Sequence, residues 1–212
     1  MRKSKIIYFF PFFFTFIFVS IIGGSVNAIE KAKYRVLEKN GRFEIRQYEK
    51  QVVAETFVEG DFESVGNEGF RRLYDYISGN NRKKQSISMT APVAQEENSQ
   101  KIAMTAPVGQ EKQGNRWRIT FMMPAEFSLE TLPEPLDGSV RLVAEPGRLM
   151  AAVRYSGTWS SKSYEKNRAQ LKAFIQKQGL RQAAMEIWAR YDPPFMPWFL
   201  RRNEVLIPVE HF

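Results

Sequence analysis

Apolar and polar residues alternate beyond residue 30, as they do in strands that have one buried face. Two alternating runs flank Asn40-Gly41, the dipeptide most typical of a two-residue hairpin turn, so we expect paired strands between residues 34 and 48. A third strand is expected at 51–58. The pattern therefore predicts that the folded part of the chain begins with antiparallel strands.

After Gly60 the alternation gives way to helical spacing. This change predicts a helix over 62–78, and Gly79 stands where helices commonly end. The apolar face of this helix is formed by Phe70, Leu73, Tyr74 and Ile77.

A second helix is expected to begin at the Ser-rich turn 160–163 and to end at Gly179, because apolar residues again follow helical spacing. Proline and glycine separate most of the remaining apolar runs, which are short enough to be strands. Further strands are expected at 86–93, 101–108, 116–123, 140–144, 148–155, 183–190 and 203–209.

The order of elements repeats within the chain. Residues 54–62 read as a strand, a glycine, an aromatic residue and a helix start, and residues 151–159 repeat this order 97 positions later. The sequence therefore predicts an α+β fold: a distorted antiparallel β-barrel built from two pseudo-symmetric βαββ repeats, with two helices packed on the sheet. A Rossmann fold is disfavoured because no Gly-rich turn follows a strand and opens a helix.

Residues 1–28 have the pattern of a secretory signal. Three cations precede an apolar run at 6–22, and Val26-Asn27-Ala28 fits a small-residue cleavage site. The run of 17 residues is near the lower limit for a membrane span, so an uncleaved anchor is the alternative. We expect cleavage after Ala28, a secreted or periplasmic protein, and a single domain over residues 29–212.

Composition limits the chemistry that the chain can perform. The 212 residues include no cysteine and one histidine, which excludes thiol catalysis, disulfides and the common Cys- or His-rich metal sites. The chain carries 31 Lys and Arg against 23 Asp and Glu, but the cations are scattered and do not indicate a nucleic-acid surface. We expect a monomer that is not an enzyme, has no nucleic-acid partner and keeps no membrane span after cleavage.

A shorter repeat lies in the middle of the chain. Residues 87–93 and 102–108 agree at six of seven positions and share the segment Met-Thr-Ala-Pro-Val. A polar linker separates them, so we interpret them as adjacent strands, each bounded by a proline. Met89 and Met104 are then expected to fill the core.

Five motifs occur between about Tyr34 and Val209 in the order in which one known family carries them. They are Ile102-Ala-Met-Thr-Ala-Pro-Val108, Phe121-Met-Met-Pro124, Leu132-Pro-Glu-Pro135, Tyr191-Asp-Pro-Pro194 and Arg201-Arg-Asn-Glu-Val205. On these motifs the chain resembles the SOUL haem-binding protein family.

The resemblance implies a distorted barrel of two βαββ repeats that binds haem or a related tetrapyrrole without a known catalytic reaction. It places the ligand in an apolar cleft between the first helix and the loop that carries Tyr-Asp-Pro-Pro. Our hypothesis for the role is haem buffering or transport. The candidate cofactor-binding residues are Phe70, Arg71 and Tyr74 on the helix, and Phe195, Met196 and Trp198 on the loop.

The chemistry of a porphyrin, an apolar disc with two propionates, agrees with aromatic walls and a cation at the rim. Arg201 and Arg202 could pair with propionates, although an internal pair with Glu204 or Asp192 is the simpler expectation. No catalytic residue is expected, and the iron ligand stays open. Tyr74 and Met196 are candidates, His211 lies beside the C-terminus, and binding without a protein ligand is a further alternative.

Two other function classes remain. The first is an enzyme or effector-binding module that acts on an apolar small molecule through a buried acid, for which Glu55, Glu145 and Glu186 are the candidates. The second is a protein-interaction module, which predicts an exposed patch around Phe195 and Trp198 without a concavity. The presence and shape of a pocket beside residues 195–198 distinguish these two classes from a haem-binding protein.

Overall fold

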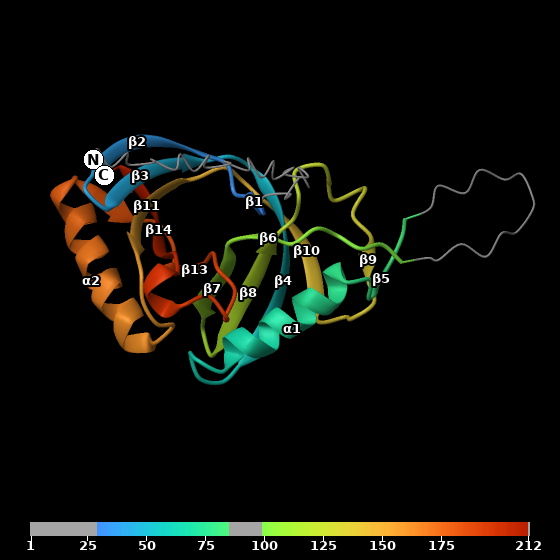
Figure 1. The fold of residues 1–212 in the computed structure, drawn as a ribbon. Coiled ribbons are helices and arrows are strands. Elements are labelled where there is room, and N and C mark those ends of the chain that lie inside the picture. The colour runs from blue at the N-terminus through green and yellow to red at the C-terminus, as the bar shows by residue number, and fades with distance from the viewer. Residues whose placement is uncertain (1–28, 85–98, 212) are drawn as a thin grey trace, which may run out of the picture.

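The computed structural model describes residues 29–84 and 99–211. The predicted signal segment, the strand predicted at 86–93 and Met89 lie outside the described residues. Within the described part, two long helices pack against one large, strongly curled sheet (Figure 1).

The sheet contains ten strands, and all of its neighbouring strands run antiparallel. Two short pairs lie outside it: β1 (Glu30–Lys31) runs parallel to β6 (Thr105–Ala106), and β5 (Asn81–Arg82) runs antiparallel to β9 (Glu134–Pro135). Along the main path the strands are β10 (Val140–Glu145), β4 (Gln51–Glu59), β8 (Arg116–Met122), β7 (Val108–Gln113), β13 (Ile187–Arg190), β14 (Asn203–His211), β11 (Leu149–Tyr155), β3 (Phe43–Tyr48) and β2 (Tyr34–Asn40), and β12 (Leu180–Gln182) pairs with β14.

The order of strands is symmetric about the pairing of β7 with β13, where Gly109 lies opposite Ala189. The segment β4-α1-β7-β8, with α1 at Val65–Ile77, is repeated by β11-α2-β13-β14, with α2 at Ser161–Lys177. The outermost strands are exchanged between the halves, because β3 pairs with β11 and β10 pairs with β4. This arrangement confirms the predicted α+β fold with two βαββ repeats.

Each helix covers its own half of the sheet. Helix α1 packs on β4 and β8, and its residue Gly69 lies so close to β8 that a Cβ atom there would collide with the side chain of Ile119. Helix α2 packs on β11, β12 and β14, and its N-terminus is capped by Ser160, whose Oγ accepts a hydrogen bond from Ser163 N at 3.3 Å. The cores under α1 and α2 are separate clusters.

The strand predicted at 101–108 is wrong in its position. Residues 99–104 form no strand, and Ile102 instead packs under α1, where its backbone N donates to Ile77 O at 2.8 Å. The hairpin partner of β8 is β7, which begins at Val108 and turns through Gly114 at φ 59°. Because β7 is mostly polar, alternation does not identify it, whereas the apolar residues before it are buried by a helix.

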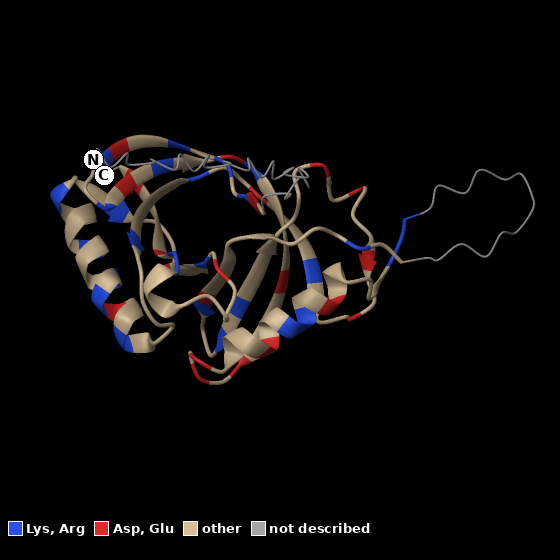
Figure 2. Ribbon diagram, in the orientation of Figure 1, with Lys and Arg blue, Asp and Glu red and all other residues tan. Residues whose placement is uncertain are grey.

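Charged residues of both signs are spread along α1 and the sheet, whereas Lys and Arg predominate on α2 (Figure 2). Neither helix in the described part of the chain combines the length and the apolar composition needed to cross a bilayer.

Candidate functional site

A cleft of about 360 Å³ lies between α1 and the segment that follows β13. Helix α1 forms one wall, residues 104–108 form the base, and the opposite wall combines Trp159 with residues 190–195. We call it the aromatic cleft. Its lining consists of Ile29, Gly66, Asn67, Phe70, Tyr74, Met104, Thr105, Ala106, Val108, Trp159, Arg190, Tyr191, Asp192, Pro193, Pro194 and Phe195.

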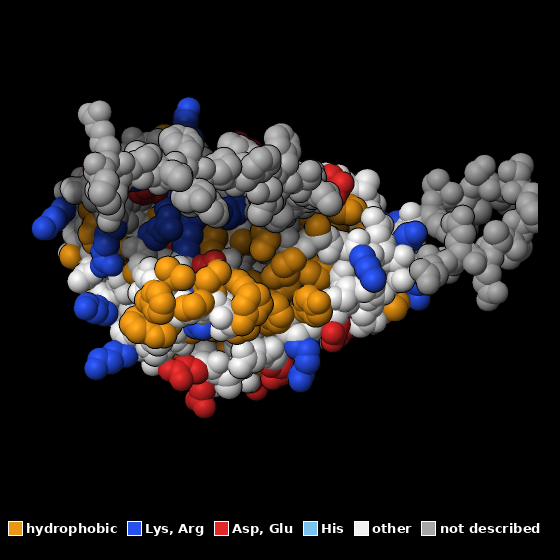
Figure 3. Space-filling view, viewed as in Figure 1, with side chains coloured by type: hydrophobic (Ala, Val, Ile, Leu, Met, Phe, Trp, Pro, Cys, Tyr) orange, Lys and Arg blue, Asp and Glu red, His pale blue; other side chains and the backbone are white. Residues whose placement is uncertain are grey.

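The aromatic cleft opens within a patch of exposed apolar side chains, which gathers over α1 and the neighbouring loop in Figure 3. Phe70 and Tyr74 lie one helical turn apart with their rings stacked, 5.8 Å between centroids. The Phe70 ring also meets the edge of buried Phe121 at 5.2 Å, so its position is fixed from below. Phe195 on the opposite side is almost fully exposed. The apolar surface is thus preformed and accessible.

The loop that carries Tyr191 and Asp192 is held by the start of β14. The Tyr191 hydroxyl donates to the fully buried Glu204 at 3.0 Å, and Asp192 Oδ2 accepts from the backbone N of Arg202 at 2.5 Å. Burial, together with the charge of Glu204, raises the pKa of Tyr191 well above its ordinary value. Tyr191 therefore serves as a neutral wall of the cleft.

Arg201 and Arg202 are engaged within the protein and do not line the cleft. Arg202 pairs with Glu204 at 2.8 Å, which confirms the internal pairing that was the simpler expectation. Arg201 donates to the carbonyl oxygens of Met196 at 2.7 Å and Pro194 at 2.6 Å, and its guanidinium lies 4.4 Å from the Trp159 ring centroid. These contacts shape the loop.

The cation in the aromatic cleft is Arg190, which the sequence analysis did not single out. It precedes the Tyr-Asp-Pro-Pro motif and is the last residue of β13. Its Nη2 donates to Gln110 Oε1 at 2.9 Å, and its guanidinium lies 4.0 Å from the ring centroid of Trp188. Burial lowers the pKa of Arg190 to about 10. The cleft thus has a half-buried positive charge in a mostly apolar lining.

The six predicted binding residues are divided by the structure. Phe70, Tyr74 and Phe195 line the aromatic cleft. Arg71 is exposed on α1, Met196 is half-buried in the loop and Trp198 is exposed in the short 3₁₀ helix η1 (Trp198–Leu200), and none of these three lines the cleft. The part that any of the six plays in ligand binding stays a prediction.

The candidate iron ligands are placed unequally. Tyr74 reaches the cleft, whereas Met196 does not line it and His211 lies at the far end of β14, paired with β12. Met104, which was expected only to fill the core, packs against the core under α1 and also lines the cleft. Among the described residues no three His, Cys, Asp or Glu side chains gather in a group that could hold a metal ion.

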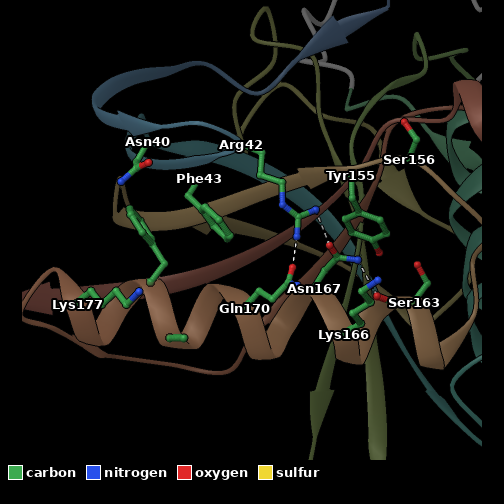
Figure 4. Close-up of a pocket in the computed structure, with 12 residues that line it drawn as sticks. Asn40, Arg42, Phe43, Tyr155, Ser156, Ser163, Lys166, Asn167, Gln170 and Lys177 are labelled. Atoms are coloured by element: carbon green, nitrogen blue, oxygen red, sulfur yellow. Dashed lines mark hydrogen bonds between the residues drawn. The ribbon is translucent and has the colours of Figure 1, made fainter.

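A second hollow of about 820 Å³ lies between α2 and the turn that joins β2 to β3 (Figure 4). Its walls are mostly polar, with Asn40, Ser156 and Ser163 among the lining residues. Arg42 extends across it and donates to Asn167 Oδ1 at 2.9 Å and to Gln170. A wall whose polar groups bind water or each other is a poor receptor for an apolar disc, so this polar groove is not the candidate site.

The three buried acids considered as catalytic groups are all ion-paired. Glu55 and Glu145 bind Arg118 at 2.5 and 2.8 Å, and Glu186 binds Arg168 at 2.6 Å. Burial alone would raise the pKa values of Glu145 and Glu186, but the neighbouring cations lower both below the ordinary value. Glu145 lines two hollows, one of about 50 Å³ and one of about 360 Å³, and its carboxylate is paired with Arg118 and Arg148.

Comparison with solved structures identifies the fold alone, because sequence identities are low. The EcmrR C-terminal domain is similar with a TM-score of 0.57 and 13% identity, over 84% of this chain and 99% of that one. A hydrolase from Listeria innocua is similar with a TM-score of 0.53 and 15% identity, over 82% of this chain and 94% of that one. The curled sheet is thus shared with proteins of different descriptions.

Comparison of sequences is more specific. Heme-binding protein 1 from Xenopus laevis is 25% identical over 187 residues, which cover 88% of this chain and 93% of that relative. Heme-binding protein 1 from Bos taurus is 23% identical over 138 residues, which cover 65% of this chain and 67% of that relative. The family model described as SOUL heme-binding protein matches residues 29–208. The chain therefore belongs to the SOUL heme-binding protein family.

Proposed function

We propose that the protein binds haem or a related tetrapyrrole in the aromatic cleft and that it buffers or carries this ligand without transforming it. The observation that carries the proposal is the preformed apolar cleft between α1 and the Tyr-Asp-Pro-Pro loop, in a chain of this family. The relatives named Heme-binding protein 1 support the same ligand class.

The lining of the cleft suits the chemistry of a tetrapyrrole. Aromatic rings on α1 and on the loop offer flat apolar contacts, and Arg190 offers a positive charge for a propionate. Tyr74 and Met104 are the side chains in the lining that could donate to iron, because the hydroxyl of Tyr191 already donates to Glu204. Bound haem would supply an iron centre, and the residues of the cleft would hold and orient it.

The size of the cleft favours reversible binding. Its volume of about 360 Å³ is near the lower end of the range for ligand pockets, roughly 300 to 1,000 Å³. A large macrocycle would therefore leave an edge outside, beside the exposed ring of Phe195. Partial burial suits a protein that takes up and releases its ligand.

A role other than catalysis is supported by the state of the buried acids, since Glu55, Glu145 and Glu186 each hold a guanidinium. Export to the periplasm or the exterior is supported by the signal pattern of residues 1–28. Amino-terminal sequencing of the purified protein checks this part, because cleavage after Ala28 would give Ile29 as the first residue.

Titration of the purified protein with haemin, followed by the Soret band, tests the main proposal. We expect a shifted band that saturates at one haemin per chain at micromolar protein concentration. A band that rises linearly without saturation would refute the proposal.

A further inference from the structure

We propose that Arg190 is the anion-recognising residue of the aromatic cleft, so that the cleft selects planar ligands with a free carboxylate over their neutral esters. This inference rests on the proposed function and adds the residue and the ligand group that determine specificity.

The first observation is the position of the Arg190 side chain. It runs beneath α1, where a Cβ atom on Gly66 would lie only 2.7 Å from its Nη2. Glycine at this position lets the helix backbone approach the guanidinium directly. The rings of Trp188 and Trp159 lie near the same guanidinium, with centroids at 4.0 and 4.9 Å. The charge is thus fixed at one end of the cleft by rigid neighbours.

The second observation is that this charge has no anionic partner. Within residues 29–84 and 99–211 no carboxylate oxygen lies within 4 Å of the Arg190 guanidinium, and its buried Nε has no hydrogen-bond partner. The one hydrogen bond of its side chain goes to a neutral amide, Gln110 Oε1. That amide is itself oriented, because Gln110 Nε2 donates to Phe62 O at 2.8 Å.

Two buried arginines of the sheet, Arg46 and Arg118, show the contrast. Arg46 binds Glu204 at 2.7 Å, and Arg118 binds both Glu55 and Glu145. A buried charge without a counter-ion is costly, and its desolvation is the reason for the lowered pKa of Arg190. At Arg46 and Arg118 the protein supplies the counter-ion from its own glutamates.

Asp192, which lines the cleft, and Glu63, beside the start of α1, each accept a hydrogen bond from the backbone. The donor to Asp192 Oδ2 is the backbone N of Arg202, and the donor to Glu63 is the backbone N of Ser161 at 3.3 Å. A carboxylate delivered by the ligand would therefore be the first acid to reach Arg190. A guanidinium can bind it with two donors, which a neutral ester cannot match.

The test compares haemin with haemin dimethyl ester, which differ in charge but share the ring and the iron. The purified protein is expected to bind haemin about 10-fold to 100-fold more tightly than the ester, the range for a charged hydrogen-bonded pair. Arg190→Gln is expected to reduce the ratio of haemin affinity to ester affinity from this range to about 1, whatever its effect on the two affinities separately. Arg190→Lys should keep part of the preference, since it retains the charge without the two-donor geometry.

Arg35→Gln is the matched control, because Arg35 is exposed on β2, away from the cleft. It should preserve the preference of the unaltered protein. A purely structural role of Arg190 would weaken both ligands equally and leave their ratio unchanged, which would overturn the inference. Equal affinity of the unaltered protein for the two ligands would overturn it without any variant, while the proposed function stands. Failure to bind either ligand would overturn both.

Discussion

Replacement of Phe70 by alanine tests whether the aromatic cleft, and not the wider apolar patch, holds the ligand. Phe70 is 37% exposed, so about 75 Å² of a ring side chain of roughly 200 Å² remains for a ligand to cover. At about 25 cal/mol per Å² this area contributes about 1.9 kcal/mol, which corresponds to about 20-fold in Kd. Haemin affinity of Phe70→Ala is therefore expected to fall by about 20-fold.

Phe199→Ala is the matched comparison, because Phe199 is also an exposed phenylalanine but does not line the cleft. At 58% exposure, the same arithmetic gives about 2.9 kcal/mol, or about 100-fold, if the patch itself were the binding surface. If the cleft is the site, Phe199→Ala changes haemin affinity by less than about 2-fold.

Soret titrations of the two variants in parallel give the decisive measurement, with circular dichroism to verify their folds. Phe70→Leu serves as a milder change that keeps contact with buried Phe121. A larger loss for Phe199→Ala than for Phe70→Ala would refute the assignment of the cleft.

Three further predictions concern stability. Gly69→Ala places a methyl group against Ile119 and should lower the free energy of unfolding by about 1–2 kcal/mol in urea titrations, despite the better helix propensity of alanine; an unchanged midpoint would contradict the close approach of α1. Glu204→Gln leaves Arg46 and Arg202 without their shared carboxylate and should cost about 3–5 kcal/mol in the same assay, whereas a neutral effect would show that this buried cluster does not stabilise the fold. The pKa of Glu145 is lower in the folded protein than in the unfolded chain, so the ionised carboxylate stabilises the fold above about pH 4.3. This stabilisation is lost as the pH falls through the pKa of Glu145 in the folded protein. Glu145→Gln should therefore make the free energy of unfolding decline less steeply on acidification, and an unchanged slope would contradict the lowered pKa.

The local pattern of the sequence is sufficient for most of the fold. The hairpin of β2 and β3 forms as predicted, but its two turn residues are Gly41, at φ 58°, and Arg42, because Asn40 is the last residue of β2 and pairs with Phe43. Helices α1 and α2 begin and end within a few residues of their predicted bounds. The repeat of 54–62 at 151–159 indicated the pseudo-symmetry, because each copy contributes a strand and a helix start.

Pairing between distant segments was harder to predict. Strand β7 owes its place to partners on both sides, and its own residues are too polar to indicate a buried strand. Strand β13 spans only Ile187–Arg190 of the expected 183–190, and the short strand β12 before it, at Leu180–Gln182, pairs separately with the end of β14. Tertiary context, and not periodicity, determines both of these strands.

The sequence was sufficient to predict aromatic residues in the walls of the candidate site, but not the arginine that gives the site its positive charge. Phe70 and Tyr74 share a helix face, so spacing alone brings them together at the cleft. Trp198 follows Phe195 by three residues, yet the turn into η1 directs it away from the lining. Arg190 is one of many arginines in the sequence, and only the packed structure shows that, within residues 29–84 and 99–211, its guanidinium has no ion-paired carboxylate.

The exchange of β3 and β10 between the two halves ties them into one folding unit. A fragment that ends before β10 would leave the edge of β4 unpaired and β3 without its partner β11. Neither this fragment nor the remaining one can form all of its strand pairs alone, whereas the two together can restore every pairing. Co-expressed fragments divided near Gly138, an exposed glycine between β9 and β10, should therefore reassemble into the complete sheet.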